Sequence, residues 1–468
     1  MNKKKLLLIN AFDRNPQNID EFFIQNPFIK AWKPIQLGII ATLTPDDWDI
    51  EIIDENYEKF YYIEADLVAI SSYTHCINSA YEIARIYKQH NTPVVLGGIH
   101  ASFFPNEAKK VVDIVAVGRA EGLWADIIHD YNNNSLKEIY YSNDTAAVCF
   151  QPRNDIFKKY NYPFGIVMAS LGCPYNCEFC NIPRFLNHKY YLRDIDEIVE
   201  DIRNIEEEYF IFSDDNIIGN TETHKQRLSE LFTKVIEKKI NKKFQCAATI
   251  NISKYPDLLK LAHKAGCVLL YIGVESDDAK ELNLFNKSSN KEYAIDKYKK
   301  AYKIINKYKI FVFGGIICGT DEDNVRDVER KKDILIKSGL TAISLTFLTP
   351  LPKTKLYERL EKEQRLLYTN FPEDWIYYNC YCVVFKPKNG SQKEFFHAYL
   401  NATYDMYNSN KGFFSSVFVR KFFKSLIRSK SLKATVDAHL MLNLIQINVY
   451  ISPFFKMIFR LYKPDVKY

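Results

Sequence analysis

The first 145 residues alternate short apolar runs with polar stretches of helical spacing. The apolar runs occupy residues 5–9, 50–53, 67–71, 93–96 and 114–117. Runs that are short and almost continuously apolar are typical of strands buried on both faces of a parallel sheet. Residues 79–90 have helical spacing and follow Asn78, a residue type that often caps helix N-termini. The pattern predicts a Rossmann-like, doubly wound α/β domain over residues 1–145, with a ligand at the carboxyl ends of its strands.

The predicted strands of this domain run into loops rich in small and polar residues. These loops are residues 71–74, 96–100 and 117–122. Paired glycines let a bulky ligand approach the backbone closely. No G-x-G-x-x-G motif follows the first strand, so we do not expect a dinucleotide.

A second series of strand–helix units follows between residues 160 and 360. The predicted strands are residues 165–170, 209–213, 244–249, 268–274, 311–317 and 342–348. Six units are fewer than the eight of a closed (β/α)8 barrel, so a partial barrel is expected, with polar active-site residues at the carboxyl ends of its strands. We expect residues 361–468 to form a separate, mostly helical C-terminal region.

The most informative chemical motif is a cysteine triplet at Cys173, Cys177 and Cys180, spaced C-x3-C-x2-C. Three thiolates so close in sequence can face one metal centre. On a four-iron cluster they leave one iron open to an outside ligand. The alternatives are a zinc knuckle and three unrelated buried thiols. Zinc sites favour C-x2-C pairs with a second pair downstream, and this chain has no such pair.

This triplet resembles the cluster loop of the radical S-adenosylmethionine (radical SAM) superfamily. Phe179 stands where that family places an aromatic residue against the adenine. The resemblance implies a [4Fe-4S] cluster held by the three cysteines, with SAM on the fourth iron. It also implies an external electron donor of the flavodoxin or ferredoxin type, whose electron cleaves SAM to methionine and a 5′-deoxyadenosyl radical.

Further segments match the family's SAM-binding positions in the family's order. Asp214, Asp215 and Asn216 follow the second barrel strand, where the resemblance places contacts to the amino group of SAM. Glu275 and Ser276 lie in a G-x-E-S segment that implies contacts to the SAM ribose and carboxylate. Residues 315–319 resemble the G-x-I-x-G strand near the adenine, and Arg193 stands where a basic residue often holds the SAM carboxylate. Lys353 occupies a position that is usually glycine, which leaves the local turn in doubt.

The N-terminal loops resemble the cobalamin-binding domain that precedes many radical SAM domains. The resemblance implies the following cobalamin-binding residues: Ser72, Thr74, Gly97, Gly98, His100, Gly118 and Glu121. The D-x-H-x-x-G motif is absent, and residues 13–15 carry no histidine. The resemblance therefore implies cobalamin without a protein imidazole on cobalt, and we favour a surface or loop-capping role for His75 and His100. Arg119 departs from the acidic residue of related loops, and a degenerate Rossmann domain without ligand is the alternative.

Composition and charge add three expectations. Ten cysteines and an N-terminal apolar run too short for a signal peptide indicate a reducing, cytoplasmic location. No apolar stretch is long enough for a membrane span. Residues 411–468 contain eleven Lys or Arg and two Asp, with interleaved phenylalanines. Such a segment can lie peripherally on the inner face of an anionic membrane, bind nucleic acid, or form a lid helix; we expect no nucleic-acid partner.

The function that this resemblance implies is a cobalamin-dependent radical SAM methyltransferase, similar to the hopanoid methylase and anaerobic bacteriochlorophyll cyclase group. It would transfer a methyl group from methylcobalamin to an unactivated carbon of a small, lipid-like or other secondary-metabolite substrate. An oxidative or cyclising enzyme acting on a tetrapyrrole-like substrate is the second hypothesis. A corrinoid and iron–sulfur sensor is the third.

Overall fold

The computed structural model describes residues 3–12, 32–143, 145, 148, 151–287, 295–338, 340 and 342–408. The chain divides into two compact units. Unit 1 comprises the residues up to Pro174, with Phe179–Ser213 and Pro350–Asn379. Unit 2 comprises Tyr175–Glu178, Asp214–Thr349 and the residues from Cys380 onward. The basic tail at residues 411–468 lies outside the described residues, and so does the loop at residues 13–15.

The first sheet lies in unit 1 and has six strands in the order β2-β1-β3-β4-β5-β6. The strands are β1 (Lys4–Asn10), β2 (Trp48–Asp54), β3 (Leu67–Ser71), β4 (Val94–Gly97), β5 (Ile114–Val117) and β6 (Ile139–Tyr141). Each neighbouring pair is parallel. The doubly wound prediction is therefore confirmed, and the first five strands coincide with the five apolar runs. The short edge strand β6 was not predicted.

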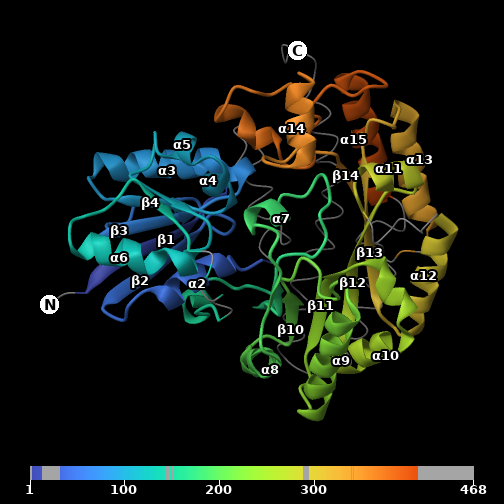
Figure 1. Ribbon diagram of the computed structural model, residues 1–468, viewed down its shortest axis with the longest axis horizontal. Helices are drawn as coiled ribbons and strands as arrows, with labels where there is room; N and C mark the ends of the chain where they lie inside the picture. The colour runs from blue at the N-terminus through green and yellow to red at the C-terminus, as the bar shows by residue number, and fades with distance from the viewer. Residues whose placement is uncertain are drawn as a thin grey trace. The chain divides into compact units, whose positions relative to one another are not determined.

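Helices cover both faces of this sheet, which is why the inner strands β3, β4 and β5 are almost continuously apolar. The helices are α2 (Ile35–Leu43), α3 (Ile77–Gln89), α4 (Ile99–Phe103), α5 (Pro105–Ala108) and α6 (Trp124–Asn132). Figure 1 shows α3, α4 and α5 on one face, with α2 and α6 on the other. On the face covered by α2 and α6, Leu37 of α2 and Trp124 of α6 pack into one core with Leu6 and Leu8 of β1.

Helix α3 was predicted correctly, but its expected cap was not. Asn78 lies inside the first turn, and the residue at the N-cap position is Cys76, which makes no side-chain capping bond. The Asn78 side chain instead donates to the Glu373 carbonyl at 3.1 Å. The Asn78 side chain therefore makes a long-range hydrogen bond and does not make the helix cap that the local sequence had suggested.

The second sheet has the order β14-β13-β12-β11-β10-β7. Its strands are β7 (Gly165–Val167), β10 (Tyr209–Phe212), β11 (Lys243–Ala248), β12 (Cys267–Glu275), β13 (Phe311–Cys318) and β14 (Ala342–Phe347). All six predicted barrel strands are present and follow one another in chain order. A separate antiparallel pair joins β8 (Ser170–Leu171) to β9 (Tyr191–Leu192).

Strands and helices alternate through this region as a partial (β/α)6 barrel requires. The helices are α7 (Ile182–Phe185), α8 (Ile195–Asn204), α9 (Glu222–Glu237), α10 (Pro256–Ala265), α11 (Ala279–Leu284), α12 (Ile295–Lys307), α13 (Val325–Lys337), α14 (Lys355–Lys362) and α15 (Gln392–Asn408). In unit 2, α9, α10, α12 and α13 lie outside β11–β14 (Figure 1). Within the described residues, no helix has both the length and the apolar character needed to cross a membrane.

Candidate cofactor sites

The loops after β3, β4 and β5 meet at one edge of the first sheet. The Ser72 amide donates to the Gly97 carbonyl at 3.3 Å, so the first two loops are joined by backbone. Gly98 has a φ of +99°, and a Cβ there would lie 2.6 Å from the Ser72 carbonyl oxygen. The Gly118 amide donates to the Ser102 hydroxyl at 2.9 Å, which fastens the third loop to the end of α4. The predicted glycine loops are thus neighbours in the folded unit.

This edge has features that suit a bulky ligand. Gly97 has no positive φ, and a Cβ there would meet only the Cβ of Ala116, at an ordinary 3.7 Å. The protein itself therefore does not require a glycine at this position. The Thr74 hydroxyl is buried and has no hydrogen-bond partner among the described residues. A corrin fits both observations, because it needs open backbone and offers amide side chains to an unsatisfied hydroxyl.

His100 is placed differently from the surface or loop-capping role that the sequence suggested. Its side chain is fully buried at the start of α4, and its Nε2 lies 3.1 Å from Glu107 Oε1. Glu107 also accepts hydrogen bonds from Tyr81 at 2.8 Å and from the Trp375 indole at 3.1 Å. Burial lowers the pKa of His100. The imidazole belongs to a packed polar cluster centred on Glu107, which sequence reasoning had not singled out.

Arg119 and Glu121 form a pair in the loop after β5. Arg119 Nη1 lies 3.6 Å from Glu121 Oε1, and the guanidinium carbon lies 4.9 Å from the centroid of the Tyr191 ring. The Arg119 side chain is buried. Arg119, which replaces the acidic residue of related loops, therefore contacts both a carboxylate and an aromatic ring. These two contacts explain how the fold accommodates a positive charge here.

The cysteine loop begins directly after β8. Gly172 has a φ of +94°, and a Cβ there would lie 2.6 Å from the Lys189 carbonyl oxygen, so the turn into the loop requires glycine. Cys177 is buried, whereas Cys173, Cys180 and the predicted adenine neighbour Phe179 are half-buried. Two bonds tie the middle of the loop to the end of α11: the Glu178 amide to the Phe285 carbonyl at 3.0 Å, and the Asn286 side chain to the Asn176 carbonyl at 3.0 Å.

Within unit 2, the charges of Glu275 and Lys287 act on the Cys177 thiol. Lys287 Nζ lies 2.7 Å from Glu275 Oε1. Burial raises the pKa of the Cys177 thiol, and Lys287 opposes this effect. Glu275 has a φ of +64°, and its carboxylate occupies the space where Gly273 has no side chain. Lys287 was not singled out from the sequence, because its partners are distant along the chain.

Other predicted SAM residues of unit 2 have varied exposure. Asp214 and Asn216 are buried after β10, and Asp215 between them is exposed. Ser276 is fully buried, and its hydroxyl donates to Glu281. The Ser276 hydroxyl therefore donates its proton within the protein, so Ser276 would contact a ligand through its backbone.

Arg193 is held by carboxylates of α8 in unit 1. Its guanidinium donates to Asp201 and, at 3.2 Å, to Glu197, and its side chain is almost completely buried. The structure thus gives Arg193 two protein partners, and its predicted contact with the SAM carboxylate stays a prediction.

No three His, Cys, Asp or Glu side chains are grouped for metal binding in the part of the chain that the structure describes. The three loop cysteines nevertheless offer a donor set of thiols alone, which suits iron–sulfur chemistry. Cys173, Cys177 and Cys180 are therefore the residues that would hold a cluster.

Comparison with known families accounts for this pairing of sites. Residues 167–331 match the family model described as the radical SAM superfamily, and residues 30–128 match the B12 binding domain. The chain is a radical SAM protein with a B12-binding domain. The cofactors implied by the two domains are a [4Fe-4S] cluster, SAM and cobalamin, as the sequence analysis predicted.

Curated relatives resemble the chain over most of its length. The bacteriochlorophyllide d C-12(1)-methyltransferase of Chlorobaculum tepidum is 25% identical over 84% of this chain and 85% of its own. The hopanoid C-2 methylase of Rhodopseudomonas palustris is 28% identical over 73% of this chain and 66% of its own. The anaerobic magnesium-protoporphyrin IX monomethyl ester cyclase of Cereibacter sphaeroides is 24% identical over 74% of this chain and 60% of its own.

Solved structures agree on the fold. The radical SAM methyltransferase TsrM of Kitasatospora setae, solved with cobalamin and a [4Fe-4S] cluster, matches with a TM-score of 0.60 at 14% identity. The match covers 85% of each chain. At this identity the similarity shows the fold alone.

Proposed function

We propose that this radical SAM protein is a cobalamin-dependent methyltransferase acting on an unactivated carbon of a lipid-like or other secondary-metabolite substrate. The observation that carries the proposal is the presence in one chain of an all-thiol loop and of an open glycine edge at Gly97. When bound, the cofactors supply a 5′-deoxyadenosyl radical and a methyl group on a corrin. Two of the three curated relatives described above transfer methyl groups.

We assign a role to each of the residues of the cysteine loop and to the Glu275–Lys287 pair. Cys173, Cys177 and Cys180 would hold the cluster and leave one iron for SAM, and Phe179 would contact the adenine. Glu275 would bind the SAM ribose, because its carboxylate can accept a hydrogen bond from each of the two ribose hydroxyls. Lys287, 2.7 Å from Glu275, orients that carboxylate. An electron donor of the flavodoxin or ferredoxin type supplies the electron from outside.

An exposed aromatic side chain supports an apolar substrate. Tyr271 lies on β12 two residues before Gly273, so the two residues share a face of the strand. The Glu275 carboxylate lies on the same face, because it occupies the position that a Cβ of Gly273 would take. Although β12 is a central strand, Tyr271 is 42% exposed, and its ring packs edge-on against Phe313 at 5.0 Å. Aromatic surface beside Glu275 suits a flat or polycyclic apolar substrate.

The proposal includes cobalamin without a protein imidazole on cobalt. His100 is fully buried, with Nε2 directed at Glu107. We expect the electron paramagnetic resonance spectrum of the Co(II) form to lack nitrogen superhyperfine splitting from the protein. Splitting that disappears in His100→Ala would overturn this part of the proposal, as would a failure to bind any corrinoid.

The deciding experiment is an anaerobic incubation of the reconstituted enzyme with methyl-labelled SAM, a reductant and extract of the source cells. Methyl transfer predicts label in an extractable small molecule, together with 5′-deoxyadenosine. The second hypothesis, oxidation or cyclisation, predicts 5′-deoxyadenosine with an unlabelled product. A sensor predicts cofactor binding without turnover. Each of these two results would overturn the methyltransferase.

A further inference from the structure

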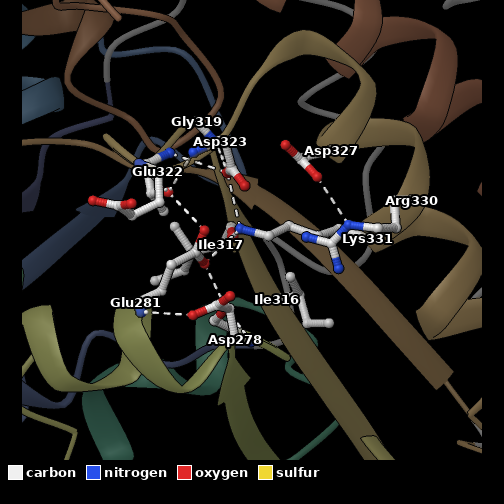
Figure 2. Close-up of polar contacts among 12 residues, drawn as sticks. Asp278, Glu281, Ile316, Ile317, Gly319, Glu322, Asp323, Asp327, Arg330 and Lys331 are labelled. Carbon is white, nitrogen blue, oxygen red and sulfur yellow. Dashed lines mark hydrogen bonds and ion pairs between the residues drawn. The ribbon is translucent and has the colours of Figure 1, made fainter. Parts of the chain in front are cut away.

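A lysine is completely buried in unit 2, behind the segments proposed to bind SAM. Lys331 lies on α13, and its ammonium donates three hydrogen bonds (Figure 2). Their acceptors are Glu281 Oε2 at 2.7 Å, Asp323 Oδ2 at 2.8 Å and the Ile317 carbonyl at 3.1 Å. Lysine is rarely buried completely unless it is paired, so this position is built around the charge.

The two carboxylates connect the lysine to both SAM segments. Glu281 accepts hydrogen bonds from the Ser276 hydroxyl, which follows β12, and from the Thr320 hydroxyl at 2.8 Å, which follows β13. Asp323 accepts the backbone amides of Gly319 at 2.8 Å and Thr320 at 3.1 Å. The ion triad therefore fixes the position where β12 ends relative to the position where β13 ends.

The triad sets one buried ammonium against two buried carboxylates. Burial opposes the charge on Lys331, but Asp323 and Glu281 outweigh it and hold the Lys331 pKa above its ordinary value. Burial raises the pKa of Asp323 to about 6, and its Oδ1 has no hydrogen-bond partner among the described residues. Removing one partner of a buried pair leaves the remaining charge uncompensated, so the flanking backbone is expected to shift.

We propose that Lys331, Glu281 and Asp323 are positioning residues of the SAM site, which set the separation between Glu275–Ser276 and the G-x-I-x-G strand that ends at Gly319. The inference rests on the proposed SAM site. Neither carboxylate contacts SAM in this proposal. Glu281 acts by fixing the Ser276 and Thr320 hydroxyls, and Asp323 by fixing the backbone amides of Gly319 and Thr320, as supporting residues do in other binding sites.

The test compares two lysines that are neighbours on α13. Lys331→Met removes the charge at the centre of the triad. Lys332→Met is the matched control, because Lys332 is also mostly buried but pairs with Glu329 and, at 3.1 Å, with Asp405 of α15. Full-length reconstituted protein is used, and SAM affinity is measured by equilibrium dialysis without reductant. Iron content and cobalamin affinity are measured on the same samples.

We expect Lys331→Met to weaken SAM binding by roughly tenfold or more, because small misplacements of binding groups are costly. Iron content and cobalamin affinity should stay at wild-type values, and Lys332→Met should bind SAM normally. A merely structural lysine would lower all three quantities together or none. The positioning role is overturned if Lys331→Met keeps its iron and binds SAM as the wild type does.

A milder variant decides the question if Lys331→Met does not fold. Thr320→Val removes the hydroxyl that donates to Glu281 and accepts the backbone amides of Glu322 and Asp323. It should weaken SAM binding by roughly threefold to tenfold, the net value of a typical hydrogen bond. Unchanged affinity in a folded Thr320→Val protein would overturn the proposal. Glu275→Gln distinguishes a failure of the proposed SAM site from a failure of the positioning role. If it leaves SAM affinity unchanged, the proposed SAM site itself fails; if it weakens SAM binding and the triad variants do not, only the positioning role fails.

Discussion

Two adjacent positions at the edge of the first sheet are glycine for different reasons. Gly98 has a φ of +99° and no room for a Cβ beside Ser72, so the fold needs it. Gly97 has neither constraint. A backbone that tolerates a side chain but does not have one is what a closely approaching ligand requires.

This difference predicts opposite phenotypes for two single substitutions. Gly98→Ala should lower the free energy of unfolding by about 2 kcal/mol or more, because the residue occupies a glycine-only region and its Cβ would clash. Gly97→Ala should change it by less than about 0.5 kcal/mol and yet weaken cobalamin binding. Denaturant unfolding and cobalamin titration measure the two effects. Normal cobalamin affinity in Gly97→Ala would contradict the assignment of this edge as the corrin site.

The cysteine loop gives a second prediction at the scale of single residues. Replacing Cys173, Cys177 or Cys180 with Ala should abolish both the cluster and SAM cleavage, because in this assignment each thiolate would hold a separate iron and leave the fourth open to SAM. Iron and sulfide assays, with 5′-deoxyadenosine as the product measured, test this.

The matched control is Cys382→Ala, since Cys382 lies outside the loop in a C-x-C pair that we assign to packing. This variant should keep wild-type iron and cleavage. Wild-type cleavage in any of the three loop variants would contradict the cluster assignment.

At the scale of elements, α8 shows how a local signal supports a functional neighbour. Asp194 precedes the helix, and its carboxylate accepts the amides of Asp196 at 2.8 Å and Glu197 at 3.2 Å. This cap fixes the start of the helix whose Glu197 and Asp201 hold Arg193. The position of Arg193 thus depends on the integrity of α8.

Asp194→Ala should therefore lower the free energy of unfolding by about 1 kcal/mol, the usual value of a lost N-cap. Asp194→Ser keeps a capping oxygen and should stay within about 0.5 kcal/mol of the wild type. Thermal and denaturant unfolding measure the difference. Equal stability of the Ala and Ser variants would show that the cap does not limit this helix.

At the scale of the whole molecule, the basic tail carries a prediction that rests on the sequence, since residues 411–468 lie outside the described part of the chain. Its excess positive charge and interleaved phenylalanines predict binding to anionic membranes, with about 1 kcal/mol from each basic residue near the surface. Full-length protein should co-sediment with anionic liposomes, less so at high salt.

Neutral liposomes and a protein ending before residue 411 are the controls, and both should abolish co-sedimentation. Full-length protein that stays in the supernatant with anionic liposomes at low salt would favour the lid-helix interpretation of the tail. Label from methyl-labelled SAM in a lipid fraction would connect the tail to the substrate.

The sequence by itself determined both sheets, and it predicted which residues would hold a cluster. Eleven of the twelve strands in the two large sheets were readable, because parallel strands covered on both faces must be apolar throughout. The exception, β6, has three residues at the sheet edge. The cysteine triplet could be recognised because its three members lie within eight residues of one another.

Only the tertiary structure decided which polar side chains are available to ligands. Lys331 and Glu281 are fifty residues apart, and Arg193, His100 and Ser276 look like exposed polar residues in the sequence. Each of these three was predicted to bind a cofactor, and each has a buried side chain paired with a carboxylate of the protein. The physical reason is that burying a charge or hydroxyl is unfavourable without a partner, and the partner is set by packing between distant segments.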